Sequence, residues 1–256
     1  MNKLSLGLAA SLLALGVAGC NQDSKGGDNA AAGGNASTAA APMKTQAPNG
    51  DWTQLVNQTP EGGMLKGNPN APVRVVEFSS MTCPACAAFA TQDEPKLTDQ
   101  YVKTGQVAFE FRNFVRDPLD MTMALVARCA GANPQFYSLT NAMFADQKTF
   151  FDRLQAVPEA QLTALQSQPP AQQFQAMAQL SGLQEWAAQR GLPSGRSSQC
   201  LANQAEIDRL VQMNSDASSS YELRGTPTFL VNNQVVQPQP NDTNWSSLER
   251  AIKAAL

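Results

Sequence analysis

The sequence of 256 residues contains no histidine, and only 15% of its residues are charged. Without an imidazole, the protein lacks the usual general base near pH 7 and the commonest metal ligand. The formal net charge is -3 and no long basic run occurs, whereas a nucleic-acid-binding surface needs clustered Lys and Arg. The sequence therefore predicts no nucleic-acid partner, and any chemistry must use cysteines, carboxylates, hydroxyls or the backbone.

The first twenty residues have the layout of a bacterial export signal. A short positive region precedes the apolar residues 4–15, which are too few for a transmembrane span, and VAGC then ends at Cys20. This ending resembles the lipobox of bacterial lipoproteins, although Val17 stands where that group usually has Leu. The resemblance implies a signal peptide over residues 1–19, a lipid on Cys20 and, because Asn21 follows, attachment to the outer membrane. The alternative is an ordinary cleavable signal with an incidental cysteine.

Residues 20–50 are small and polar and show no periodicity. Such a segment cannot bury enough apolar surface to offset the entropy of ordering its backbone. It therefore predicts a flexible tether with a reach of roughly 30 Å. The expected location of the folded domain is the periplasmic side of a bacterial membrane, held by the lipid anchor.

Two apolar segments begin the folded region. Residues 73–78 are β-branched and apolar enough for a buried strand, and residues 106–115 alternate as a second strand. The residues between them show helical spacing, with Pro95 expected to kink or divide the helix. A strand, helix and strand in this order predict a right-handed crossover and a parallel pair of strands.

The middle of the chain is rich in Ala, Gln, Leu and Met. Asp117-Pro118 is typical of a helix start, and the segments NP, PP and GLPSG separate further helices. Strand signals return in GTPTFLVNNQVV, whose Asn-Asn pair indicates a hairpin, and a last helix follows. The predicted fold is α/β, with a βαβ part over residues 51–116, a helical insertion over 117–222 and a ββα part over 223–256.

The CPAC sequence follows directly after the first strand. A CxxC spacing alone is only suggestive, but here it lies where a strand passes into a helix. Free backbone N–H groups and the helix dipole favour negative charge at such a point, so a thiolate at Cys83 is expected to be stabilised. Cys86, one turn further, is expected to be shielded and to act as the resolving thiol. Pro84 suits the first turn because its missing N–H has no helical partner there.

Glu77 is a charged residue within the apolar first strand, six positions before Cys83. One interpretation is a carboxylate at an outward-facing edge. The other is a buried acid beneath the dithiol with a raised pKa, able to accept and return the proton of Cys86.

The segments VVEFSSMTCPAC and RGTPTFLVN together resemble the DsbA-like thiol:disulfide oxidoreductases of the thioredoxin superfamily. The resemblance covers about residues 62–256 and implies a thioredoxin fold with a central mixed sheet and an inserted all-helical domain. It also implies that Cys83 is the nucleophile, Cys86 the resolving thiol and Glu77 the buried acid. Pro227 is expected to be cis and, with Thr226, to form the wall that receives the substrate backbone.

Ala85 is a departure from the best-known members of this group, which have histidine at this place. Without an imidazole, thiolate stabilisation depends on backbone donors and the helix dipole. We therefore expect a less acidic Cys83 and a less oxidising disulfide than in a relative with CPHC.

Cys129 and Cys200 remain outside the motif. In an exported protein such an even pair usually forms a structural disulfide, and some DsbA-like relatives have a second disulfide in the helical domain. The alternative is a pair of free, buried thiols.

The predicted activity is thiol–disulfide exchange, which oxidises or reduces cysteine pairs in exported proteins, with no cofactor and no metal. A membrane redox partner must reset the dithiol, and the sequence leaves the direction open, so a reductase or isomerase is an alternative. A redox-inactive binding or chaperone-like lipoprotein would keep the fold without the chemistry. A four-thiolate zinc module would instead use Cys83, Cys86, Cys129 and Cys200 as metal ligands.

Overall fold

The computed structural model describes residues 43–221 and 223–256. The predicted signal peptide, the lipidation at Cys20 and the tether up to residue 42 lie outside these residues. Residues 43–50 belong to the range predicted as tether, but the backbone of Lys44 exchanges hydrogen bonds of 2.7 and 3.0 Å with the side chain of Asn57. This end of the range is therefore attached to the domain. Within the described ranges, no helix combines the length and the apolar character needed to cross a membrane.

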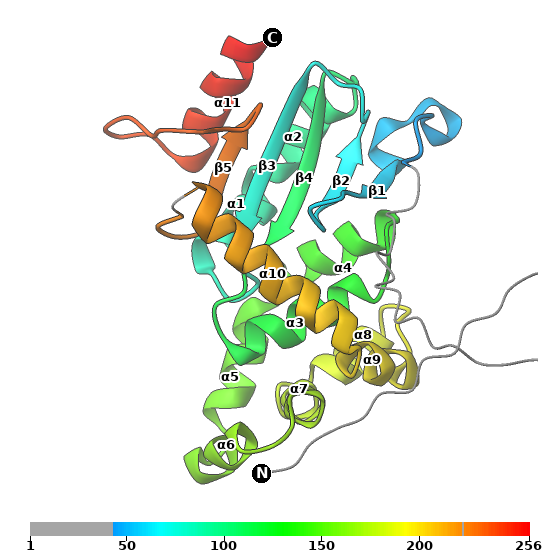
Figure 1. Ribbon diagram of the computed structural model, residues 1–256, viewed down its shortest axis with the longest axis vertical. Helices are drawn as coiled ribbons and strands as arrows, with labels where there is room; N and C mark the ends of the chain where they lie inside the picture. The colour runs from blue at the N-terminus through cyan, green and yellow to red at the C-terminus, as the bar shows by residue number, and fades with distance from the viewer. Residues whose placement is uncertain (1–42, 222) are drawn as a thin grey trace, which may run out of the picture. The chain divides into compact units, whose positions relative to one another are not determined.

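The described strands form one mixed sheet of six, in the order β1-β2-β4-β3-β5-β6 (Figure 1). Strands β3 and β4 are parallel, as predicted, and every other neighbouring pair is antiparallel. The strands are β1 (Val56–Gln58), β2 (Met64–Gly67), β3 (Val73–Ser79), β4 (Val107–Asn113), β5 (Thr228–Val231) and β6 (Gln234–Val235). The pair β1 and β2 is absent from the sequence-based prediction, because each strand is too short to show a period.

The connection between β3 and β4 contains α1 (Pro84–Gln92), α2 (Glu94–Leu97) and one π-helical turn, η3 (Thr98–Val102). The helical stretch is divided at Asp93, two residues before Pro95, because Pro95 lacks the N–H that a continuous helix would bond and its ring would clash with the carbonyl group four residues earlier. The last helix, α11 (Asn244–Ala255), begins with a reciprocal capping box between Thr243 and Ser246.

The inserted helices lie between β4 and β5. They are α3 (Pro118–Arg128), α4 (Pro134–Ala145), α5 (Gln147–Gln155), α6 (Glu159–Gln166), α7 (Pro170–Leu180), α8 (Leu183–Ala188), α9 (Ser194–Leu201) and α10 (Gln204–Tyr221). A disulfide joins Cys129, at the end of α3, to Cys200 in α9, with an S–S distance of 1.96 Å. The expected pairing is therefore present, and the two helices are covalently linked across the insertion.

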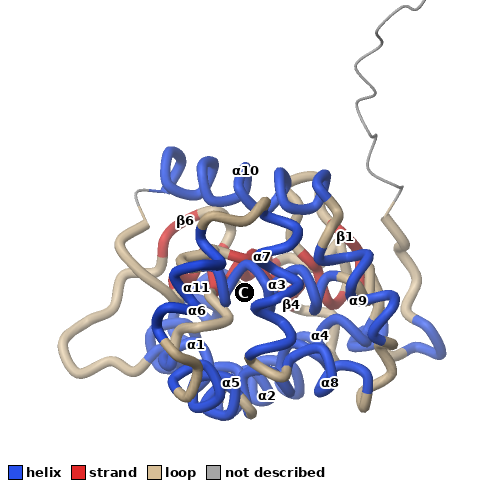
Figure 2. The backbone as a smooth tube through the Cα atoms, turned by 90° about the horizontal axis from the view of Figure 1, so that it is seen from below, coloured by secondary structure: helices blue, strands red, loops and turns tan. Residues whose placement is uncertain are grey.

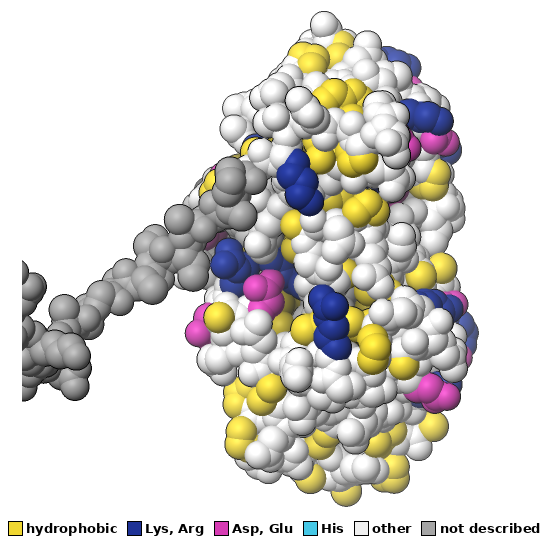
Figure 3. Space-filling view, turned by 90° about the vertical axis from the view of Figure 1, so that its right-hand side faces the viewer, with side chains coloured by type: hydrophobic (Ala, Val, Ile, Leu, Met, Phe, Trp, Pro, Cys, Tyr) yellow, Lys and Arg dark blue, Asp and Glu magenta, His cyan; other side chains and the backbone are white. Residues whose placement is uncertain are grey.

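Helices cover both faces of the sheet, with α10 on one face and α1, α2 and α11 on the other (Figures 1 and 2). Because side chains alternate along a strand, β3 supplies buried residues to both faces. Val75 packs in the core shared with α1 and α11, whereas Val76 and Phe78 pack with Ala217 of α10. On the face shown in Figure 3, Lys and Arg side chains are interspersed with Asp and Glu, so this face has no continuous basic surface.

Candidate active site

The two motif cysteines lie at the start of α1. Cys83 is the N-cap residue with an extended backbone, and Pro84 is the first helical residue, as predicted. Both thiols are free and buried, with exposed fractions of 4% for Cys83 and 0% for Cys86. Ala85 between them is exposed. A partner molecule can therefore approach along Ala85 and reach Cys83 before Cys86.

The two thiols have pKa values shifted in opposite directions. Hydrogen bonding by the Cys86 thiol, and then by the Thr226 side chain and the N–H groups of Cys86 and Ala85, lowers the pKa of Cys83 well below its ordinary value, although burial opposes the shift. Burial, the hydrogen bond to Cys83 and the charge of Glu77 raise the pKa of Cys86 far above its ordinary value. At neutral pH the pair therefore holds one negative charge, and that charge is on Cys83.

The loop before β5 faces the dithiol. The peptide bond between Thr226 and Pro227 is cis, and the Cys83 thiol, when protonated, donates a hydrogen bond of 3.1 Å to the carbonyl oxygen of Thr226. Apart from the Cys83 sulfur, the buried hydroxyl of Thr226 has no hydrogen-bond partner among the described residues. Both residues thus lie where the resemblance to DsbA-like proteins expects them.

Glu77 lies inside the sheet and not at an outward-facing edge. Its exposed fraction is 2%, and its neighbours across the strands are Phe111 of β4 and Phe229 of β5. Burial raises the pKa of Glu77 to about 8, and the Ser79 hydroxyl offsets only part of this shift. Glu77 Oε1 has no hydrogen-bond partner within the described part of the chain. The structure therefore supports the interpretation of a buried acid that is neutral near pH 7.

The dithiol is also surrounded by residues to which the sequence assigned no role. Asp120, Gln147 and Arg116 contact the loop that leads to Cys83. Ser79, two residues after Glu77 on the same face of β3, is fully buried, and its hydroxyl lowers the pKa of the Cys86 thiol against the larger effect of burial. No spacing signal could have found these residues, because each contact joins segments far apart in the sequence or depends on the path of a loop.

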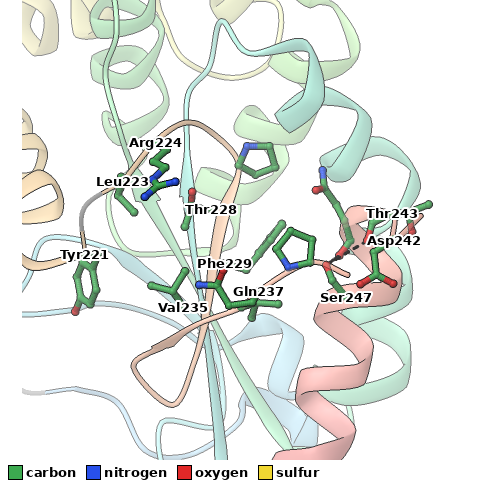
Figure 4. Close-up of a pocket in the computed structure, with 14 residues that line it drawn as sticks. Tyr221, Leu223, Arg224, Thr228, Phe229, Val235, Gln237, Asp242, Thr243 and Ser247 are labelled. Atoms are coloured by element: carbon green, nitrogen blue, oxygen red, sulfur yellow. Dashed lines mark hydrogen bonds between the residues drawn. The ribbon is translucent and has the colours of Figure 1, made fainter. Parts of the chain in front are cut away.

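A pocket of about 470 Å³ adjoins Pro227. Its wall combines the end of α10, the strands β5 and β6, the loop after β6 and the first turn of α11 (Figure 4). Tyr221 and Leu223 lie on one side, and Thr243 and Ser247 lie on the other. Pro227 lines this pocket, but neither Cys83 nor Cys86 does.

The four-thiolate zinc module is contradicted by the structure. Cys129 and Cys200 are joined to each other, so their sulfurs are not available as thiolate ligands together with Cys83 and Cys86. Among residues 43–221 and 223–256, no group of three or more Cys, Asp or Glu side chains is arranged to hold a metal ion.

A mixed sheet with a CxxC dithiol at the start of the first covering helix, opposite a cis-proline, defines the dithiol class of thioredoxin-fold proteins. The family model described as thioredoxin matches residues 59–254, and the chain belongs to this family. The DsbA-like fold with a helical insertion, predicted from the sequence, is confirmed.

Solved structures and curated proteins show the same likeness. The crystal structure of a protein-disulfide isomerase from Novosphingobium aromaticivorans has a TM-score of 0.67 and 34% identity, covering 74% of this chain and 95% of that chain. The structure of alpha-DsbA1 from Wolbachia pipientis has a TM-score of 0.58 at 21% identity, over 77% of this chain and 92% of that one, and shows the shared fold.

A Rickettsia conorii protein named as a protein-disulfide oxidoreductase is 25% identical over 193 residues. That match covers 75% of this chain but only 61% of the Rickettsia protein, so this chain spans less than two-thirds of its length.

Proposed function

We propose that this protein is a thiol:disulfide oxidoreductase that exchanges disulfides with cysteine-containing proteins. The observation that carries the proposal is a pair of free thiols at the start of α1, beside a cis-proline. Hydrogen bonds lower the pKa of Cys83, and burial raises the pKa of Cys86. The thiolate is the nucleophile and also the better leaving group, so a stabilised Cys83 thiolate suits both halves of an exchange reaction. The names of the relatives agree with this chemistry.

In the oxidising direction, the reaction starts from a Cys83–Cys86 disulfide. A substrate thiolate attacks Cys83 Sγ, so a bond forms between the substrate sulfur and Cys83, and Cys86 leaves with the electron pair. Because the pKa of Cys86 is strongly raised, its sulfur takes up a proton, and neutral Glu77 is the acid on the same face of the sheet. A second substrate thiolate then attacks the substrate sulfur and releases Cys83 as a thiolate. The substrate gains a disulfide and the protein retains two electrons.

The stabilised thiolate favours the reduced protein, which makes the disulfide an oxidant. This supports net oxidation of substrates, after which a membrane redox partner must remove the two electrons. The expected signal peptide and lipidated Cys20 support a periplasmic site of action on exported proteins, anchored at the outer membrane. A reductase or isomerase would use the same residues in the reverse direction.

Trapping of the mixed disulfide tests the proposal. A Cys86→Ser variant lacks the resolving thiol. When its Cys83 thiolate attacks a peptide disulfide and releases one peptide thiolate, the mixed disulfide should accumulate, be detected by mass spectrometry and be released by dithiothreitol. The matched Cys83→Ser variant should form no adduct, because Cys86 is buried and protonated. A double Cys129→Ser, Cys200→Ser variant should retain peptide oxidation, since its dithiol is unchanged. Equal trapping by both single variants, or no oxidation of a dithiol peptide by the wild type, would refute the proposed activity.

A further inference from the structure

The loop between β3 and Cys83 consists of residues 80–82 and belongs to no helix or strand. All three of its residues are buried. A buried loop without a strand or helix partner depends on individual hydrogen bonds to its backbone and hydroxyl groups. The position of Cys83 therefore depends on whatever side chains supply those bonds.

Asp120, in the first turn of α3, supplies several of them. Its carboxylate accepts hydrogen bonds from the Ser80 hydroxyl at 2.5 Å, from the Met81 N–H at 2.7 Å and from the Arg116 N–H at 3.0 Å. The Arg116 side chain in turn donates to the Ser80 hydroxyl at 2.8 Å. The carboxylate is completely buried, so water cannot replace these bonds if it is removed.

Gln147, the first residue of α5, holds the same loop from another direction. Its side-chain amide donates to the carbonyl oxygen of Met81 at 2.8 Å and to that of Cys83 at 3.2 Å. Both backbone polar groups of Met81 are thus bonded by side chains of the helical insertion, and the two side chains come from different helices.

Backbone N–H groups of this loop, and of the helix that follows it, act directly on the two sulfurs. The Ser80 N–H is among the groups that lower the pKa of Cys86, against the larger effect of burial. The N–H groups of Ala85 and Cys86, at the start of the helix that the loop introduces, help to lower the pKa of Cys83. Donors of this kind act through a fixed geometry, and a displacement of a few tenths of an ångström weakens them.

We propose that Asp120 and Gln147 are positioning residues for the dithiol, and that the helical insertion, through these two side chains, sets how strongly the Cys83–Cys86 pair oxidises. The inference rests on the proposed function, thiol–disulfide exchange, and adds a role for the insertion in it.

Asp120 could act on Cys83 by holding the loop in position or by its negative charge, and the two roles predict opposite changes in the pKa of Cys83 when Asp120 is removed. If Asp120 acts as a nearby negative charge, removing it makes the Cys83 thiolate easier to form. If Asp120 holds the loop, removing it loosens the N–H donors and makes the thiolate harder to form. If Asp120 holds the loop, the pKa of Cys83 should also rise more in Asp120→Ala than in Asp120→Asn, because asparagine keeps one acceptor oxygen.

The experiment titrates the Cys83 thiolate by its ultraviolet absorbance in the full chain and measures the redox equilibrium with glutathione. Asp120→Ala should raise the thiolate pKa by about one unit and shift the equilibrium about tenfold toward the protein disulfide. Asp120→Asn and Gln147→Leu should each produce about a threefold shift in the same direction. The double variant of Asp120→Asn and Gln147→Leu should shift the redox equilibrium by less than the product of the two single shifts, because both side chains hold Met81.

Thr122→Val is the matched control. Thr122 is also buried in α3, but its hydroxyl donates to Pro118 of the same helix and not to the active-site loop. This variant should lower the melting temperature and leave both redox measurements unchanged.

An unchanged or lowered Cys83 pKa in Asp120→Ala would overturn the proposal. So would a redox shift in Thr122→Val that matches its loss of stability. Failure of the proposed function would appear separately, as a wild type that cannot oxidise a peptide, while the thiolate titration would still compare the variants.

Discussion

Glu77 and Glu110 are both buried carboxylates on neighbouring strands of one sheet, but they face opposite sides. In the register of β3 and β4, Glu77 pairs with Phe111, and Glu110 pairs with Val76. Glu110 is completely buried, and it accepts hydrogen bonds from Arg112, Arg74 and Thr59 at 2.6–3.1 Å. Burial alone would raise the pKa of Glu110, but the hydrogen bond and charge of Arg112 and the charge of Arg74 lower it below its ordinary value.

The two sites show that burial by itself does not decide the charge of a carboxylate. Glu110 is surrounded by cations and donors, so it stays ionised and joins β4 to the neighbouring segments as a fixed part of the structure. Glu77 has an oxygen without a donor among the described residues, and its pKa is about 8, so it can exchange a proton near neutral pH. A carboxylate that can change its charge is useful beneath a dithiol, whereas one that cannot is useful as a support.

Removal of the Glu110 carboxylate should have the largest effect on stability. Glu110→Ala leaves Arg74 and Arg112 with only the half-exposed Glu61 carboxylate, at 4.0 and 3.6 Å, as an anionic partner. We therefore expect a loss of about 3 kcal/mol in the free energy of unfolding. Urea unfolding followed by circular dichroism measures it. The shape-conserving Glu110→Gln variant should lose less, because its amide oxygen still accepts a hydrogen bond. A loss below about 1 kcal/mol in Glu110→Ala would show that the network is not structural.

Glu77 should make the stability of the fold depend on pH. Its folded-state pKa is about 8 against an ordinary value of 4.5, so the folded protein binds one more proton than the unfolded chain between these pH values. Stability from this group is therefore complete below pH 4.5 and is lost as the pH rises toward 8, by at most about 1.4 kcal/mol per pH unit.

The measurement compares unfolding of the wild type and Glu77→Gln from pH 5 to pH 8. The variant should lack this part of the slope and should gain stability relative to the wild type as the pH rises. Parallel curves for the two proteins would contradict the raised pKa of Glu77.

Glu77→Gln should also slow exchange. An amide cannot deliver a proton to the departing Cys86 sulfur, so we expect oxidation of a dithiol peptide to be about tenfold slower at pH 7. The first attack on Cys83 expels Cys86 and is the step that needs this proton, so stopped-flow measurement of mixed-disulfide formation should show the defect. Attack of the second substrate thiolate releases Cys83 as a stable thiolate and should keep its rate. An equal slowing of both steps would indicate a general distortion of the site.

Much of the fold was accessible from the sequence because its signals are local. The apolar run of β3, the Asp117-Pro118 start of α3 and the asparagine pair between β5 and β6 each have a short-range cause, and the structure contains each feature. Strands β1 and β2 have no such signal, since their pairing with each other and with β4 depends on contacts far along the chain.

The residues of the candidate site also fall into those that a local motif indicates and those that only long-range contacts reveal. CPAC and the TP pair are visible as motifs, and together they indicated the dithiol and its facing proline. Whether Glu77 points inward was open in the sequence, because a strand face becomes buried only when a helix packs on it. Asp120 and Gln147 could not be selected at all, since their partners are backbone groups of a loop 39 and 66 residues earlier.

The smallest predicted effect is that of a substitution at Ala85. A cation beside the Cys83 thiolate should lower the pKa of Cys83, as Arg112 lowers the pKa of Glu110. Arg112 lowers the pKa of Glu110 by placing a cation beside an anion, and an imidazolium at position 85 would do the same for the Cys83 thiolate. Because Ala85 is exposed, solvent screens part of this attraction.

We expect Ala85→His to lower the thiolate pKa of Cys83 by about half a unit to one unit, measured by ultraviolet titration, and to make the disulfide more oxidising against glutathione. Ala85→Gln, which adds a polar side chain without charge, should change neither value. A higher Cys83 pKa in Ala85→His would mean that the existing N–H donors depend on a small residue at this position, and that the missing histidine does not weaken the oxidant.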